Sequence, residues 1–256
     1  MPTLHYREAG QGEPLLIIHG LFGTLENWGA QIKALAAHFR VFAVDLRNHG
    51  RSPWREQMDY PSLSADLVQF LDQHDLERVS LLGHSMGGKA AMQLALDHPT
   101  RVSRLLVVDI APVRYPPGHG NVFDGLFAVD LAHLGNRSDA EGQLAVHIPE
   151  AGVRQFLLKN LYRDGHHFAW RMNLKVLHRE YDRIAAAPEG KAPYPGPTQF
   201  IKGGLSDYIQ EAHRSAIGHW FPNATARVME GVGHWPHAEK PELFTRLALR
   251  FLQPPG

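Results

Sequence analysis

The segment that most constrains this chain joins a short apolar run, residues 79–82, to a helical stretch at residues 89–98. The residues between them read Gly83-His84-Ser85-Met86-Gly87-Gly88, which contains the pattern G-x-S-x-G. A serine in such a tight strand-to-helix turn has strained backbone angles, and a Cβ at the flanking positions would clash with neighbouring backbone. The turn lifts the serine hydroxyl above the sheet, beside a helix N-terminus whose free N–H groups stabilise negative charge. This context, more than the motif itself, makes Ser85 a candidate nucleophile.

Short apolar runs and helical runs alternate over the first 112 residues. The expected strands are 4–8, 14–18, 40–44, 79–82 and 104–108, and the expected helices are 27–38, 62–74 and 89–98. In the second helix, Leu63, Leu67, Phe70 and Leu71 recur at helical spacing and give one apolar face. Such alternation predicts the α/β class, with a parallel sheet and crossover helices.

The pattern changes at residue 113. No buried strand is expected between 113 and 195, where we predict helical runs at 153–162 and 169–184. A proline-rich linker at 185–197 leads back to an α/β pattern, with strands at 198–202 and 224–229 and helices at 210–220 and 242–252. We therefore expect a core made of residues 1–112 and 196–256, with a helical cap at 113–195.

Composition excludes several classes of partner. Lys plus Arg and Asp plus Glu balance at 26 each, whereas nucleic-acid binding needs a cationic excess. No apolar run approaches the roughly 20 residues of a membrane span, so no integral membrane segment is expected. The chain has no cysteine, which excludes disulfides, a cysteine nucleophile and thiolate metal sites. The N-terminus has no recognisable secretory signal, so we expect a cytoplasmic protein.

A serine nucleophile needs a base, since its hydroxyl is barely nucleophilic at neutral pH. The chain has 17 histidines, so position must select the base. His234 lies in a loop between the last expected strand and the last helix. In hydrolases with a serine nucleophile in this kind of turn, the base of the Ser-His-acid triad is the last of the three residues in the sequence and lies in such a loop. For His19, His49, His84 and His237, which also flank motifs, we expect structural roles.

The third member must be a carboxylate that orients the imidazole and stabilises its protonated form. Asp109 ends one expected strand, and Asp207 follows the next core strand. Both lie at carboxyl ends of strands, where ligand sites of open α/β sheets form. Spacing alone does not separate the two carboxylates.

An oxyanion hole is expected from two backbone N–H groups. One belongs to Met86, the residue after the nucleophile, and the other to the loop after the second strand. That loop reads His19-Gly20-Leu21-Phe22-Gly23, and we assign the second donor to Leu21, with Phe22 as the alternative.

Five blocks of sequence resemble the α/β-hydrolase superfamily and, more narrowly, the YbfF-type esterases and the abhydrolase-domain-containing 11 proteins. The blocks are His19-Gly20-Leu21-Phe22-Gly23, Asp45-Leu46-Arg47-Asn48-His49-Gly50-Arg51-Ser52, Gly83-His84-Ser85-Met86-Gly87-Gly88-Lys89, Val108-Asp109-Ile110-Ala111-Pro112-Val113 and Gly233-His234-Trp235-Pro236-His237-Ala238-Glu239-Lys240-Pro241. The resemblance covers essentially the whole chain. Its second and fourth blocks are the more specific ones.

This resemblance implies an α/β-hydrolase fold with a mostly parallel, eight-stranded sheet and a helical cap. It implies hydrolysis of esters, with thioesters such as acyl-CoA as a further substrate class. It also implies that the acid stands at Asp109, because Ser206 corresponds to the position of the commoner acid. Asp207 remains the alternative acid.

The expected activity is that of a serine esterase acting on small-molecule carboxylic esters or thioesters, of short to medium acyl chain, through an acyl-enzyme. No cofactor is expected, and no metal site either, since the sequence has no metal-ligand spacing such as H-E-x-x-H. The alternatives are an acyl-CoA thioesterase, a cofactor-free haloperoxidase or carbon–carbon bond hydrolase with the same triad, and a catalytically inactive binding module. The sequence does not predict the oligomeric state. Aromatic and leucine side chains of the cap could line an acyl pocket or form the cap's own core: Phe123, Phe127, Phe156, Leu157, Leu161 and Trp170.

Overall fold

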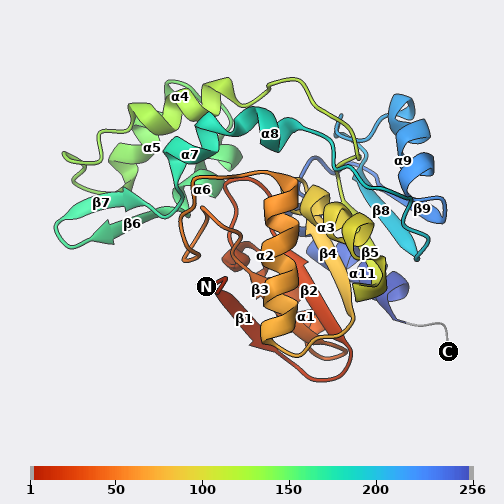
Figure 1. Cartoon of the computed structure of the whole chain (residues 1–256). Coiled ribbons are helices and arrows are strands. Elements are labelled where there is room, and N and C mark those ends of the chain that lie inside the picture. The colour runs from red at the N-terminus through yellow and green to blue at the C-terminus, as the bar shows by residue number, and fades with distance from the viewer. Residues whose placement is uncertain (1–2, 254–256) are drawn as a thin grey trace.

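The fold is built on one twisted sheet, seen in a computed structural model that describes residues 3–253 (Figure 1). Its strands are β1 (Tyr6–Ala9), β2 (Pro14–Ile18), β3 (Arg40–Val44), β4 (Val79–His84), β5 (Val102–Val108), β8 (Thr198–Gly203) and β9 (Ala224–Met229). They lie in the order β1-β3-β2-β4-β5-β8-β9. Only β1 is antiparallel to its neighbour, so the sheet is mostly parallel as expected.

The implied count of eight strands is wrong for the described residues, which form a seven-stranded sheet. Residues 3–5 precede β1 and form no strand, so β1 is the edge of the sheet beside β3. The two first strands also do not pair with each other, although they are joined by a short turn. β1 pairs with β3, and β2 lies on the other side of β3.

Helices cover both faces of the sheet (Figure 1). On one face lie α2 (Tyr60–Gln73) and α3 (Met86–Asp97), and on the other lie α1 (Gly29–Leu35) and α11 (Pro241–Leu252). Strand alternation explains this division, because Leu16 and Ile18 of β2 pack with the first pair and Leu15 and Ile17 with the second. Crossover helices on both faces are the usual cover of a parallel sheet.

Several shorter helices and turns complete the core. The helix predicted at 27–38 is shorter than expected and is preceded by a 3₁₀ turn, η1 (Leu25–Trp28). Near the C-terminus, 3₁₀ turn η3 (Glu211–His213) and helix α9 (Arg214–Trp220) lie between β8 and β9, and helix α10 (Pro236–Glu239) precedes α11. A further 3₁₀ turn, η2 (Pro99–Arg101), leads into β5.

Residues 113–195, here called the insertion, lie between β5 and β8 and extend across the top of the view in Figure 1. Their helices are α4 (Gly120–Ala128), α5 (Arg137–Ala145), α6 (Ala151–Leu158), α7 (Leu174–Arg179) and α8 (Tyr181–Ala185). They also contain an antiparallel hairpin of β6 (Leu161–Asp164) and β7 (His167–Trp170).

The hairpin corrects the two helices predicted at 153–162 and 169–184, each of which overlaps one of its strands. Its loop has two residues, Gly165 and His166, and Gly165 has φ 61°. Two-residue hairpin loops need such a positive φ at their first residue, which glycine adopts without strain. Each strand has only four residues, and most of them are not buried, so the sequence gives no buried β pattern.

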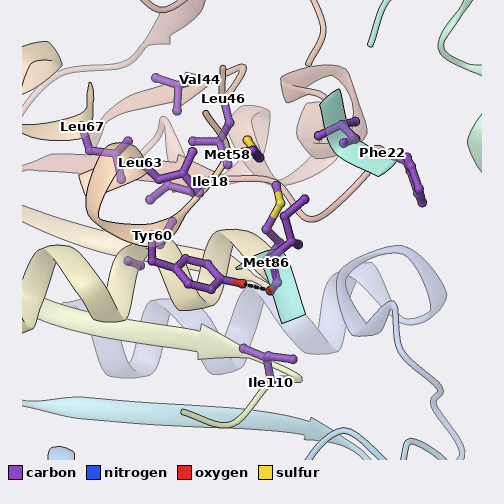
Figure 2. Packing of buried hydrophobic residues seen from close by; sticks show 14 of the residues in the cluster. Ile18, Phe22, Val44, Leu46, Met58, Tyr60, Leu63, Leu67, Met86 and Ile110 are labelled. Carbon is purple, nitrogen blue, oxygen red and sulfur yellow. Dashed lines mark hydrogen bonds between the residues drawn. The ribbon is translucent and has the colours of Figure 1, made fainter. Parts of the chain in front are cut away.

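Buried hydrophobic side chains of α2, the sheet and the start of α3 meet near the carboxyl end of β4. Figure 2 shows Tyr60, Met86 and Ile110 close together at this place, next to the core around Leu63 and Leu67. Within residues 3–253, no helix combines the length and the hydropathy required to cross a bilayer.

Candidate active site

Ser85 stands at the turn between β4 and α3 in the conformation that its motif predicts. Its backbone has φ 53° and ψ −122°, a strained combination for a residue with a side chain. A Cβ on Gly83 would lie 2.4 Å from the Gly87 carbonyl oxygen, and one on Gly87 would lie 2.3 Å from that of His19. The glycines are therefore required by close backbone contacts, and the strained turn exposes the Ser85 hydroxyl at the carboxyl end of the sheet.

His234 lies in the loop between β9 and α10, 149 residues beyond Ser85 in sequence. The Ser85 hydroxyl donates to His234 Nε2 at 3.1 Å. On the other side of the ring, His234 Nδ1 donates to Asp109 Oδ2 at 2.7 Å. The ring of Tyr208 stacks on His234, with ring centres 4.0 Å apart. The imidazole is thus held between a hydroxyl and a carboxylate in a single orientation.

Asp109 follows β5 directly and is fully buried. Its Oδ1 accepts the Gly203 N–H at 2.9 Å, and its Oδ2 accepts the Ser206 hydroxyl as well as His234 Nδ1. These donors stabilise a carboxylate that burial would otherwise make costly. The hydroxyl of Ser206 therefore lies directly against the acid.

Asp207, the alternative acid, lies elsewhere. It is exposed at the rim of a cavity, and its backbone carbonyl accepts Gln210 Nε2 at 3.0 Å. His234 forms its hydrogen bonds with Asp109 and Ser85, and the structure gives none to Asp207 among the described residues.

The residues of the two expected oxyanion donors, Leu21 and Met86, line the same cavity as Ser85. Met86 opens α3, where the first N–H groups of a helix have no acceptor within the helix. Leu21 lines the cavities that also contain Ser85. The alternative donor, Phe22, has φ 60°, and its N–H donates to His49 Nε2 at 3.2 Å. Because the Phe22 N–H already has an acceptor, the geometry favours Leu21.

Buried histidines hold the loops of the site. His19 Nδ1 donates to the Gly20 carbonyl at 2.8 Å, and His19 Nε2 accepts the Leu46 N–H at 3.0 Å. His84 Nε2 donates to the backbone carbonyl of His234 at 2.7 Å. Burial lowers the pKa of His19 to about 4, and it lowers the pKa of His49 and of His237 to about 3. These rings are therefore neutral at pH 7: His19, His49 and His84 form hydrogen bonds, and His237 packs as an aromatic ring on Trp28.

Acidification is expected to destabilise the fold because these rings are neutral when folded. A histidine in the unfolded chain has a pKa of about 6.5 and binds a proton once the pH falls below that value, whereas the buried rings stay neutral. The free energy of unfolding therefore falls as the pH falls. Between pH 7 and pH 5 the loss is about 2 kcal/mol for each such histidine. Urea denaturation at pH 7, 6 and 5 measures it.

A variant of the buried His237 and a control variant of the exposed His166 form a matched pair for this measurement. It stacks on Trp28 with ring centres 4.1 Å apart, and a phenylalanine can keep that contact without titrating. His237→Phe should reduce the pH dependence, whereas substitution of the exposed His166 by glutamine should not. An unfolding free energy that is constant from pH 5 to 7 would contradict the neutral state of these rings.

Two cavities meet at Ser85. The larger, about 440 Å³, is lined by Tyr60, Lys89, Tyr115 and Ile184 among others. The smaller, about 250 Å³, contains His234 and Trp235.

The aromatic and leucine residues considered for an acyl pocket divide between these cavities and the core. Phe156 and Leu157 line the smaller cavity. The others lie apart from both cavities: Phe123, Leu161 and Trp170 are buried in the hydrophobic core, and Phe127 is exposed.

Sequence reasoning missed two groups at this site, whereas the expected structural role of His84 agrees with its contact to the His234 loop. Tyr208 stacks on His234, and Lys89 is buried beside the larger cavity. Lys89 follows Ser85 by one helical turn, which is a visible signal for its position. Tyr208 has no such signal, because its contact with His234 joins distant parts of the chain.

Comparison with known proteins shows the family of this chain. The model of the alpha/beta hydrolase fold family matches residues 13–241, so the chain belongs to that family. It is 42% identical over 246 residues to the mouse sn-1-specific diacylglycerol lipase ABHD11, covering 93% of this chain and 80% of that protein. It is 40% identical over 240 residues to esterase YbfF of Escherichia coli, covering 93% and 92% of the two chains.

The solved structure of a marine microorganism esterase is also similar, with a TM-score of 0.96 and 37% identity. The match covers 98% of this chain and 100% of that one. These relatives confirm the resemblance to YbfF-type and abhydrolase 11 proteins, and the chain is a hydrolase of this family.

Proposed function

We propose that this hydrolase cleaves carboxylic esters of short to medium acyl chain through a covalent acyl-enzyme on Ser85. The observation that carries the proposal is the hydrogen-bonded series from the Ser85 hydroxyl through His234 to the buried Asp109 carboxylate. In such a series the imidazole can accept the serine proton, and the carboxylate stabilises the imidazolium that results. The esterase and lipase names of the relatives support the same reaction class.

In the first half of the reaction, Ser85 Oγ attacks the ester carbonyl carbon while His234 Nε2 takes the hydroxyl proton. The carbonyl oxygen becomes an oxyanion held by the N–H groups of Leu21 and Met86. The bond to the leaving alcohol then breaks, and His234 gives that alcohol its proton. In the second half, water repeats these steps on the acyl-enzyme and releases the acid.

The two cavities support a division of the substrate. His234 lines the smaller cavity, so the group that it protonates should leave on that side. The acyl chain then extends into the larger cavity, over Met86 and toward Lys89. Residues 113–195 contribute to both cavities, and we propose that they act as a cap over a core of residues 1–112 and 196–256.

Three arginines of the insertion already have partners within the chain, which disfavours their use for a coenzyme A phosphate. Arg114 pairs with Asp182 at 2.7 Å, and Arg154 Nη1 donates to the Ile148 carbonyl at 2.9 Å. The guanidinium of Arg163 lies over the ring of Phe168, 4.8 Å from its centre. Since these three arginines already have partners, we propose esters as the main substrates and acyl-CoA as the minor class. We also propose that the protein acts in the cytoplasm.

Steady-state rates across p-nitrophenyl esters from acetate to octanoate, run beside acetyl-CoA and octanoyl-CoA, test this assignment. We expect kcat/KM for the best ester to exceed that for the best thioester at least tenfold. Turnover of thioesters alone would contradict the ester preference. Failure to hydrolyse any of these substrates would contradict the proposed function itself.

A further inference from the structure

Lys89 occupies an unusual place for a lysine. It lies on α3 one helical turn beyond Ser85, is 2% exposed, and lines the larger cavity. Burial of an ammonium group is costly unless other groups compensate it. No carboxylate forms an ion pair with Lys89 among the residues that the structure describes. The position therefore calls for a specific reason to hold a lysine.

Backbone carbonyls and aromatic rings around Lys89 compensate the burial of its ammonium group. Its Nζ donates to the carbonyls of Ala185 and Ala186 at 3.0 and 2.6 Å. The ammonium also lies 4.7 Å from the ring centre of Tyr115 and 5.6 Å from that of Tyr60. Both carbonyls belong to the end of α8, where the insertion returns to the core. Lys89 therefore joins the helix that follows the nucleophile to the end of the insertion.

Gln93 repeats this contact one turn further along α3. Its Nε2 donates to the Glu189 carbonyl at 2.6 Å, and its Oε1 accepts the Glu189 N–H at 3.1 Å. Residues four apart lie on one face of a helix, so Ser85, Lys89 and Gln93 share a side of α3. Residues 184–189, here called the return segment, run along that side.

Two tyrosines hold the start of the return segment. The Tyr60 hydroxyl donates to the Ile184 carbonyl at 2.5 Å. Figure 2 shows the Tyr60 hydroxyl with a dashed line leaving it. The Tyr115 N–H donates to the Ala185 carbonyl at 3.0 Å. Tyr115 belongs to the first residues of the insertion, so the entry and exit of the insertion meet beside Lys89.

The return segment forms a wall of the cavity that we assigned to the acyl chain, since Ile184 and Ala185 both line it. Ser85 and Lys89 are separated by about 6 Å along the helix axis. From this spacing we expect an acetyl group on Ser85 to end short of the wall and a chain of six to eight carbons to reach it.

We infer that Lys89 and Gln93 determine acyl-chain specificity, because they hold the return segment against α3 and so fix the far wall of the acyl cavity. The inference rests on the proposed function. Neither side chain touches the reacting atoms, so both are positioning residues. Their loss should affect the binding of chains that reach the wall and leave the chemistry of short esters intact.

Lys89→Met tests this role, because methionine keeps an unbranched side chain and removes the donors. With p-nitrophenyl hexanoate and octanoate, KM should rise about tenfold while kcat stays within about twofold. With p-nitrophenyl acetate, kcat and KM should both stay within about threefold. Lys33→Met, which removes an exposed lysine of α1, is the matched control and should leave every constant unchanged.

Gln93→Leu is the second variant and keeps the inference testable if Lys89→Met does not fold. It releases the Glu189 end of the return segment. KM should again rise for the long esters and not for acetate, by a smaller factor than in Lys89→Met. Equal losses on all esters, unchanged constants on all esters, or a wild-type enzyme that accepts only acetate would each overturn the inference. Turnover of the Ser85→Ala variant at the wild-type rate would instead overturn the proposed function.

Discussion

Replacement of Ser85 by alanine is expected to remove ester hydrolysis while the fold persists. The reason is that Ser85 Oγ is the atom that becomes acylated, and no other described hydroxyl donates to His234 Nε2. In serine hydrolases of known mechanism, loss of the nucleophile lowers kcat by about 10⁶. We expect a fall of that size for p-nitrophenyl butyrate. Circular dichroism should give a spectrum equal to that of the wild type.

Ser103→Ala is the matched control for this variant. Ser103 lies on the neighbouring strand β5, and its hydroxyl pairs with that of Ser80 at 2.9 Å, toward the opposite end of the sheet from Ser85. It should keep wild-type turnover. If Ser85→Ala retained turnover within tenfold of the wild type, Ser85 would have no place in the mechanism.

Asp109→Asn is expected to give the second largest effect. The asparagine fits the same space, but its amide presents a donor or a weaker acceptor to His234 Nδ1 in place of a carboxylate. The imidazole then loses both its tautomer control and the stabilisation of its charged form. In a serine protease with the same kind of triad, this change lowers kcat by about 10⁴, and we expect a similar loss here.

Asp207→Asn is the matched control, since it makes the same chemical change at an exposed aspartate in the loop after β8. Turnover of this variant should stay within about threefold of the wild type. The reverse result, with a large loss at Asp207 and a small one at Asp109, would transfer the role of the acid to Asp207.

The parts of the site that depend on local sequence could be predicted. A serine in a tight turn needs glycines at fixed positions, so Gly83 and Gly87 already indicate the turn in the sequence. The alternation of apolar and helical runs likewise predicts the parallel sheet, because crossover helices must separate parallel strands. His234 could be predicted from its place between the last strand and the last helices.

The choice between the two aspartates could not be made from spacing. Both follow the ends of core strands, and β5 pairs directly with β8, so both residues lie at the same edge of the sheet. Which aspartate points into the site depends on the backbone angles of the individual residue, and spacing in the sequence does not give these. Asp109 has φ 51°, which accompanies its inward position, whereas Asp207 lies at the surface.

The insertion is the part that the sequence predicts least well, for physical reasons. Its hairpin strands, β6 and β7, have few buried residues and so lack the pattern of a core strand. Lys89 and Gln93 bind backbone carbonyls 96 residues away in sequence, and a carbonyl group carries no side-chain signature. Such contacts can be recognised only when the fold is known.

Covalent labelling with a fluorophosphonate tests the central claim most directly, because the reagent reacts with an activated serine and mimics the acylation step. Intact-protein mass spectrometry should find one adduct for each wild-type chain, and peptide mapping should locate it on Ser85. The Ser85→Ala variant should take up none. An adduct on a different residue, or an active wild-type enzyme that takes up no label, would contradict the account.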